Sequence, residues 1–223
     1  MKRGVTTIVF LFLSLFSFLS GQSDAFTDPR DGQTYATFTL NGMEWFAENL
    51  RFETSGSFYY NSSGYGEQYG RLYTLYEAGS ACPEGWRLPS DRDWKDLLVT
   101  AGGYHDMETG ELVGDRKRGF QSLMMNGNGA FSARLGGGVF GQDFTGINTQ
   151  GYFWAARLVS DRPVYYSLES GRETVQRRTG GAPGNAFSCR CVRPAASVQF
   201  YDQPVKVKTT VSGAGRPLGG SPF

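Results

Sequence analysis

The clearest pattern in the chain is a late series of short runs in which apolar and polar residues alternate. Four such runs follow one another, over residues 151–158, 164–169, 173–178 and 186–192. Turn-forming residues separate them, as in the Ser-Gly-Arg segment at 170–172. Period-two alternation between turn signals is typical of β-strands. The pattern therefore predicts an antiparallel meander of four strands.

An earlier hairpin is predicted over residues 37–46. Apolar and polar residues alternate on both sides of Asn41-Gly42, a dipeptide that favours the tight turn of a two-residue hairpin. The preceding residues, 22–36, are polar and rich in turn formers. We expect them to form an irregular N-terminal lead-in.

The best-marked helix begins after Ser90. This residue is a good N-cap, and Asp93, three residues on, can return the hydrogen bond as a capping box. Trp94, Leu97 and Leu98 then form an apolar stripe at helical spacing, and a pair of glycines ends it.

Two further helices and one irregular region complete the pattern. The spacing predicts a helix over residues 72–81 and a short one over 120–125. Between residues 126 and 150 the chain is dense in glycine and has few signals for a regular element. Two helices early, a long irregular loop region and a late antiparallel sheet indicate an α+β domain.

The first residues have the pattern of an export signal. Lys2 and Arg3 precede an almost wholly apolar run from Val5 to Leu19, and small residues follow. This is the layout of a secretory signal peptide. We expect residues 1–21 to be a signal peptide that exports the chain to the periplasm or the bacterial cell surface. An uncleaved N-terminal anchor is the alternative.

Length and charge narrow the choice of partner. About 200 residues remain after the signal, which is the size of one domain. The chain has 22 lysines and arginines and 21 aspartates and glutamates; without Lys2 and Arg3 the balance is 20 to 21, a net charge of −1. A nearly neutral chain gives no reason to expect nucleic acid as a partner.

Three cysteines in an exported chain imply one disulfide and one remaining thiol. Cys189 and Cys191 are two residues apart, so on a strand both point to the same face. Their Cα atoms would then lie about 6.5–7 Å apart, at the edge of what a disulfide spans. Cys82 is therefore expected to pair with one of the two.

Several motifs occur in an order that resembles a known family. They are Tyr-Gly-Arg-Leu-Tyr-Thr at 69–74, Ala-Cys-Pro-Glu-Gly-Trp-Arg-Leu-Pro-Ser at 81–90, Phe-Ser-Ala at 131–133, Gly-Gly at 137–138, Gly-Tyr-Phe-Trp at 151–154 and Cys-Val-Arg at 191–193. Together they resemble the Fibrobacter succinogenes major paralogous domain, over about residues 33 to 194.

The resemblance implies an exported bacterial domain with a C-type-lectin-like fold, here over residues 37–194. It also implies binding or adhesion at the cell envelope of Bacteroidota or fibrobacters. The cysteine of the family's Arg-Cys-Val-Arg motif is Cys191, so the resemblance implies a Cys82–Cys191 disulfide with Cys189 as the free thiol. The chain departs from relatives in two ways: it has no cysteine pair before the first motif, and Arg87 stands where histidine is common.

The ligand face that the resemblance implies lies at the long-loop region and the neighbouring sheet. Sugar sites combine an exposed aromatic ring with planar polar groups, and protein sites use aromatic and arginine anchors. The candidate ligand-binding residues with these side chains are Arg134, Asp143, Asn148, Tyr152, Trp154 and Arg157. Tyr152 and Trp154 could instead belong to the core, as we expect of Trp45, Trp86 and Trp94.

A second candidate surface is the tyrosine cluster of Tyr59, Tyr60, Tyr65 and Tyr69. Its alternative interpretation is a glycine-rich loop held in place by tyrosines. Either candidate surface would suit a surface glycan or an envelope protein as the partner.

We expect no enzyme activity, cofactor or metal. The formylglycine-generating enzymes have a related fold and a similar Arg-Leu-Pro-Ser stretch, but they need a reactive cysteine pair. Here Cys191 is assigned to the disulfide and Cys189 lacks a redox partner. The single histidine, His105, expected in a solvated loop, is too few for a histidine-based zinc site or triad. Asp143 and Asn148 match no spacing of a calcium loop.

The composition changes again after residue 194. Residues 195–223 begin with alternating valines and lysines and end rich in glycine, proline and serine. They are expected to be either a solvated tail or an extended strand that pairs with the edge of a partner's sheet. The sequence thus predicts a non-catalytic exported binding module. The alternative is a structural accessory subunit of an outer-envelope complex, docked through this tail.

Overall fold

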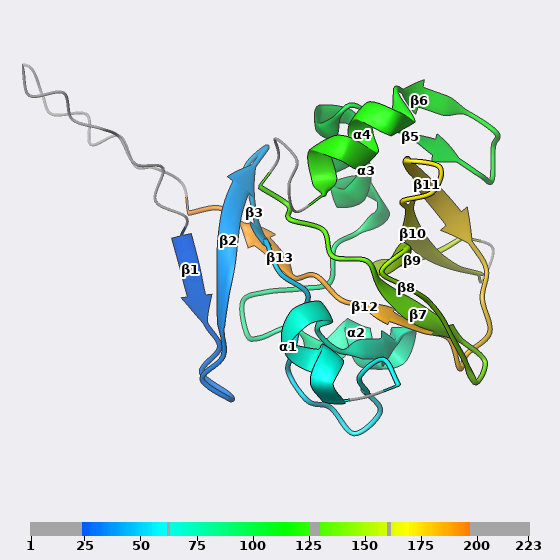
Figure 1. The fold of residues 1–223 in the computed structure, drawn as a ribbon. Coiled ribbons are helices and arrows are strands. Elements are labelled where there is room, and N and C mark those ends of the chain that lie inside the picture. The colour runs from blue at the N-terminus through cyan, green and yellow to red at the C-terminus, as the bar shows by residue number, and fades with distance from the viewer. Residues whose placement is uncertain (1–23, 62, 125–129, 160–161, 197–223) are drawn as a thin grey trace, which may run out of the picture.

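The computed structural model describes residues 24–61, 63–124, 130–159 and 162–196. The expected signal peptide and nearly all of the expected tail lie outside the described residues. The described chain forms two β-sheets and four α-helices (Figure 1). None of these helices is long and apolar enough to cross a membrane.

The first sheet has four strands, in the order β1 (Asp24–Thr27), β2 (Thr34–Leu40), β3 (Met43–Phe46) and β13 (Val192–Pro194). The predicted hairpin is confirmed: β2 pairs with β3, and Asn41 and Gly42 both have the positive φ that its turn requires. Residues 24–36 were expected to be irregular. They supply β1 and the start of β2 instead, because the Asp28 and Gln33 main chains close a turn between the two strands.

The second sheet has nine strands, in the order β4 (Leu72–Thr74), β12 (Ala186–Ser188), β7 (Gly136–Phe140), β9 (Gln150–Val159), β10 (Arg162–Glu169), β11 (Thr174–Thr179), β5 (Gly103–Asp106) and β6 (Leu112–Gly114), with β8 (Asp143–Ile147) paired to β7. The predicted antiparallel meander is confirmed for β9, β10 and β11. The fourth predicted strand is elsewhere. Because β5 occupies the free edge of β11, the chain returns across the sheet, and β12 pairs with β4, β7 and β9.

The region between residues 126 and 150 is more regular than its composition predicted. Residues 136–147 form a hairpin of β7 and β8. Gly136 and Gly138 leave room for side chains of other segments that pack closely against β7. A Cβ at Gly136 would lie 3.1 Å from the Tyr69 Cβ, and one at Gly138 would lie 2.9 Å from the Phe187 ring. The packing of this hairpin therefore requires glycine. Because glycine has a weak strand propensity, the sequence did not predict the strands.

The four helices are α1 (Gly66–Tyr69), α2 (Leu75–Ala81), α3 (Asp91–Ala101) and α4 (Arg116–Leu123), with a 3₁₀ turn at Ser63–Tyr65. The capping box of Ser90 and Asp93 is present at the start of α3, as predicted. The other two predicted helices begin elsewhere. Thr74 caps α2, so residues 72–74 are free to pair as β4. Asp115 caps α4, which begins at Arg116, four residues before the predicted start at 120.

Aromatic core clusters cover both faces of the nine-stranded sheet. On one face, Phe153 and Tyr166 pack against Trp94 of α3. On the opposite face, Trp154 packs against Phe187, in the cluster that contains α2. Figure 1 shows α3 and α4 on one side of this sheet and α1 and α2 on the other. The domain is therefore mixed α and β, with far more sheet than the sequence predicted.

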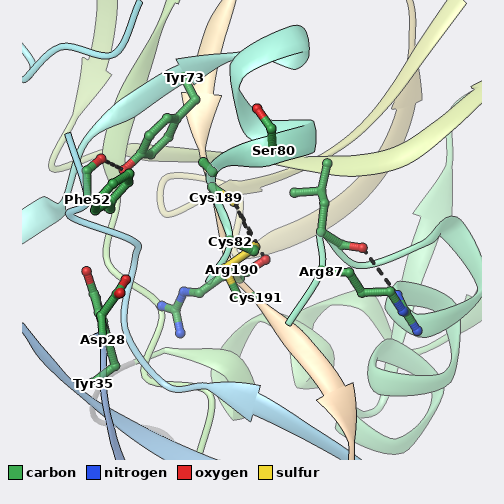
Figure 2. Close-up of a disulfide and its surroundings, with 12 residues drawn as sticks. Asp28, Tyr35, Phe52, Tyr73, Ser80, Cys82, Arg87, Cys189, Arg190 and Cys191 are labelled. Carbon is green, nitrogen blue, oxygen red and sulfur yellow. Dashed lines mark hydrogen bonds between the residues drawn. A yellow bond between two sulfur atoms is a disulfide. The ribbon is translucent and has the colours of Figure 1, made fainter. Parts of the chain in front are cut away.

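One disulfide joins Cys82, directly after α2, to Cys191, directly before β13 (Figure 2). It closes a loop with a sequence separation of 109 residues. In the chain-entropy model, a loop of this length contributes about 4–5 kcal/mol of stability. Of the two pairings that spacing left open for Cys82, the structure contains the one that the resemblance implied. Cys189 is free and buried.

Between the two cysteines lies Arg190, whose side chain is completely buried. Its guanidinium donates to Asn49 Oδ1 at 2.7 Å and to the carbonyl oxygens of Phe46, Phe131 and Ser132. Arg190 therefore joins the end of β3 to the segment that leads into β7.

Candidate functional site

The structure disperses the six candidate ligand-binding residues. Arg134 and Asn148 line one cavity together. Asp143 is exposed at the start of β8, at the hairpin tip, and takes no part in that cavity. Arg157 lies on β9, but its side chain is outside the part of the chain that the structure describes.

Tyr152 and Trp154 lie on β9, on the face that carries Phe187. Trp154 is 1% exposed and its indole N–H donates to the carbonyl oxygen of Tyr73 at 2.7 Å. Tyr152 is 8% exposed and stacks on Phe187. Both residues are thus core residues, the alternative that their motif left open. Trp45, Trp86 and Trp94 are also buried, as expected.

The cavity that holds Arg134 and Asn148 has a volume of about 210 Å³. It lies between the end of α1, the segment that precedes β7 and the turn that joins β8 to β9. Its walls are formed by Gln68, Tyr69, Met124, Ala133, Arg134, Leu135 and Asn148. The structure thus brings two residues of the first candidate set together with Tyr69, a member of the tyrosine cluster.

Asn148 is held at the cavity by its backbone. It occupies the turn between β8 and β9 with a φ of 64°, a conformation that asparagine tolerates better than most residues. Its main-chain N–H donates to the carbonyl oxygen of Leu135 at 2.8 Å. The Tyr69 hydroxyl donates to Asn148 Oδ1 and accepts from Gln68 Nε2. The side-chain Nδ2 donates to no described residue.

Arg134 is the one cation among the described residues of the cavity wall. Its side chain is partly exposed, and among the described residues it has no hydrogen-bond or ion-pair partner. Most of the other arginines that the structure describes are paired with a carboxylate or bonded to the main chain, as Arg71 and Arg193 are. A guanidinium without a partner at a cavity can bind an anion bidentately.

An aromatic cluster borders this cavity and consists of Phe58, Tyr60, Tyr65, Tyr69 and Phe144. Its ring centroids follow one another at 5.9 Å for Phe58–Phe144, 5.2 Å for Tyr60–Phe144, 6.1 Å for Tyr60–Tyr65 and 5.9 Å for Tyr65–Tyr69. Tyr65 and Phe144 are the most exposed members, at 36% and 38%. The cluster therefore presents aromatic surface beside the polar groups of the cavity.

Arg71 holds the loop that carries this cluster. Its side chain is buried and donates to Ser57 Oγ at 2.8 Å and to Glu53 Oε1 at 2.9 Å. Its guanidinium also lies over the Tyr59 ring, 4.2 Å from the centroid. A Cβ on Gly66 would meet that same ring at 2.2 Å. The contacts of Arg71 and Gly66 thus hold this loop in place. The buried part of the loop therefore matches the alternative that the sequence allowed, a glycine-rich loop held by tyrosines.

Three other cavities are poorer candidates. One of about 150 Å³ contains Tyr152, Tyr165 and Arg178, but Arg178 is already bonded to Ser167 and Gln176. A second cavity, of about 510 Å³, contains the exposed Tyr76 between mostly apolar walls. The third, of about 310 Å³, has no charged side chain among the described residues that line it. The alternation along β10 and β11 could have identified Tyr165 and Arg178 from the sequence. No sequence signal would have identified Gln68 or Leu135.

Cys189 and Cys191 are buried, and Cys82 is partly buried. Burial raises the pKa of the Cys189 thiol to about 12. Its sulfur lies 3.9 Å from that of Cys82, and all three cysteine sulfurs lie within 4.8 Å of one another. Two of them are bonded in the disulfide, so this group is not a metal-ligand set while the disulfide is closed. His105 was expected in a solvated loop. It lies partly buried on β5 instead, because the Gly-Gly end of α3 leads directly into that strand.

Comparison with known families agrees with the motifs. The model of the Fibrobacter succinogenes major domain matches residues 38–193 of this chain. The chain therefore belongs to this family, as the resemblance implied. A search of curated proteins and a search of solved structures found no match. The match includes the whole cavity and the aromatic cluster.

Proposed function

We propose that this member of the Fibrobacter succinogenes major domain family is a non-catalytic binding module that recognises a surface glycan or protein. The observation that carries the proposal is the pairing of a polar cavity with an exposed aromatic cluster. Arg134 and Asn148 offer unoccupied donors, and Tyr65 offers an accessible ring beside them. Planar polar groups next to an aromatic face are the combination that sugar recognition uses, and aromatic residues and arginine are the common anchors of protein interfaces.

The size of the cavity favours the glycan. At about 210 Å³ it is smaller than the range of about 300–1,000 Å³ typical of sites for drug-sized ligands. It suits a single sugar ring or a similarly small group, with the rest of the ligand lying along the aromatic cluster. The supporting hydrogen bonds of Arg71 and Tyr69 hold the site in its binding geometry, which reduces the entropy lost on association.

The proposal also includes a C-type-lectin-like fold and a location in the periplasm or at the cell surface. A C-type-lectin-like arrangement is supported by the way the domain closes on itself, since β13 near its end pairs with β3 near its start. Export is supported by the N-terminal charged and apolar sequence and by the disulfide, which persists in oxidising compartments. A periplasmic or cell-surface location would give the module access to envelope glycans.

A glycan array and a pull-down from intact cell envelopes test this function. Tyr65→Ala and Asn148→Gly remove the exposed ring and the free amide, and glycine tolerates the positive φ at 148. We expect each variant to weaken capture at least about fivefold, or about 1 kcal/mol. The matched control is Tyr76→Ala, because Tyr76 is 89% exposed and lies on α2, away from the cavity. Capture that survives both site variants, or that Tyr76→Ala alone abolishes, would exclude this site.

A further inference from the structure

Some polar groups of the cavity wall already form hydrogen bonds with one another, and others are left to bind a ligand. The Tyr69 hydroxyl donates to Asn148 Oδ1 and accepts from Gln68 Nε2, so both of these contacts are internal. The groups that remain are the Nδ2 of Asn148 and the guanidinium of Arg134, which are donors, and the amide oxygen of Gln68, which is an acceptor. Among the described residues that form the wall, none has an acidic side chain. A ligand that suits this site therefore brings acceptors for Asn148 and Arg134, preferably with a negative charge at Arg134, and it can place a hydroxyl donor at Gln68.

The electrostatic surroundings strengthen this requirement. Burial lowers the pKa of the nearby Arg190 guanidinium, and the positive charge of Arg134 lowers it further. Arg190 has no carboxylate among its four hydrogen-bond acceptors. Two cations that disfavour one another gain from an anion placed at the more accessible of the two, which is Arg134.

We propose that Arg134 binds the carboxylate of an acidic sugar residue, of the uronic or sialic acid class, in a ligand whose ring occupies the cavity. This inference rests on the proposed glycan-binding function. The guanidinium and carboxylate form a bidentate pair, and Asn148 Nδ2 donates to a carboxylate or ring oxygen. Met124, Ala133 and Leu135 supply apolar walls for the C–H face of the ring. A phosphate fits less well, because its charge of about −1.5 to −2 would face one partly exposed cation.

Binding measured by calorimetry with matched oligosaccharides tests this inference. The probes are oligosaccharides containing galacturonate, glucuronate or terminal sialate, each compared with its carboxyl-reduced neutral form, and inorganic phosphate as a competitor. At least one acidic probe should bind tenfold or more tightly than its neutral form. Arg134→Gln should remove that preference, a loss of about 1.4 kcal/mol per tenfold. Arg134→Lys keeps the charge but not the planar fork, so it should recover only part of the affinity.

The outcomes separate this inference from the proposed function. Equal binding of acidic and neutral forms, undiminished binding by Arg134→Gln, or capture of proteins but no glycans would overturn the sugar-acid inference while leaving a binding module. Competition by inorganic phosphate at the affinity of the acidic sugars would reassign the site to phosphate. If neither the glycan array nor the envelope pull-down captures any ligand, the proposed function itself fails. Because Arg134 has no partner among the described residues, Arg134→Gln should unfold at the same urea concentration as the wild type, which confirms that lost binding is not lost folding.

Discussion

Replacing Gly137 with alanine tests whether β7 approaches the aromatic cluster as closely in solution as in the structure. Gly137 has a φ of 66°, and an added Cβ would lie 2.5 Å from the Thr145 carbonyl oxygen and 2.6 Å from the Tyr60 ring. Gly141, at the turn of the same hairpin, has a φ of 68° and nothing within 4 Å of its added Cβ. The two positions share one backbone conformation and differ in the space around it.

The matched conformation allows the two costs to be separated. Placing alanine in the left-handed region costs about 1–2 kcal/mol, and the smaller entropy of the unfolded chain returns up to about 1 kcal/mol. Gly141→Ala should therefore lower the free energy of unfolding by about 0–2 kcal/mol. Gly137→Ala adds an overpacking cost of about 1–3 kcal/mol, because a main-chain oxygen of β8 cannot rotate away. The total loss for Gly137→Ala should be about 1–5 kcal/mol, which is about 1–3 kcal/mol more than for Gly141→Ala.

Urea unfolding of both variants, with the disulfide intact, measures this difference. Gly137→Ala should also weaken ligand capture, because relieving the contact displaces Tyr60 or β8, and both adjoin Phe144 in the aromatic cluster. The reasoning would be refuted if the two variants lost the same free energy of unfolding. That result would mean that the hairpin and the tyrosine loop are farther apart than the structure places them. The rigid support of the cavity by this packing would then be excluded as well.

Two further predictions concern buried charges. Burial raises the pKa of Asp91, but hydrogen bonds from Arg177 and Tyr166 outweigh this and hold the pKa below its usual value. The stability that ionised Asp91 contributes to the folded state is complete above the unfolded pKa of about 3.9 and is lost as the pH falls through the folded pKa. Asp91→Asn should therefore lower the free energy of unfolding by about 3 kcal/mol at pH 7. When unfolding is measured over a pH series, the variant should also lose less stability than the wild type at acid pH. Arg190→Met should lower the free energy of unfolding in urea by about 3–5 kcal/mol, because Asn49 and three main-chain carbonyls lose their donor. Unchanged stability would mean that removing the buried charge offsets the lost hydrogen bonds.

Local signals in the sequence were sufficient for elements whose determinants are adjacent in the chain. The Asn41-Gly42 turn and the capping box at the start of α3 were predicted because each depends on a few neighbouring residues. The family motifs further implied the cysteine pairing. The start of α2 was misplaced because Leu72 belongs to β4, and this depends on pairing with Ser188, more than a hundred residues away. Sheet order was inaccessible for the same reason.

The candidate site was harder to predict because it assembles from four separate segments. Asn148 and Arg134 were identified as planar polar residues near a glycine-rich region, and they do meet. Trp154 belongs to the same candidate set and is only six residues from Asn148, but it is buried against Phe187 instead. The alternation along β9 gives its two faces, but both faces of this sheet are covered by core clusters. Residue type and strand face were therefore insufficient to separate a ligand residue from a core residue.

The glycines that concealed the β7–β8 hairpin are also the reason that the cavity exists. Strand propensity is low at Gly136-Gly137-Gly138, yet larger residues would push away the rings of the tyrosine loop on one side and Phe187 on the other. If the loop moved outward, the Tyr69 hydroxyl would no longer reach Asn148, and the Nδ2 of Asn148 would lose its fixed direction. A glycine run beside aromatic motifs therefore indicates close ring packing from a distant segment. In this chain, that packing holds Arg134 and Asn148 at one cavity, where their side-chain donors have no partner among the described residues.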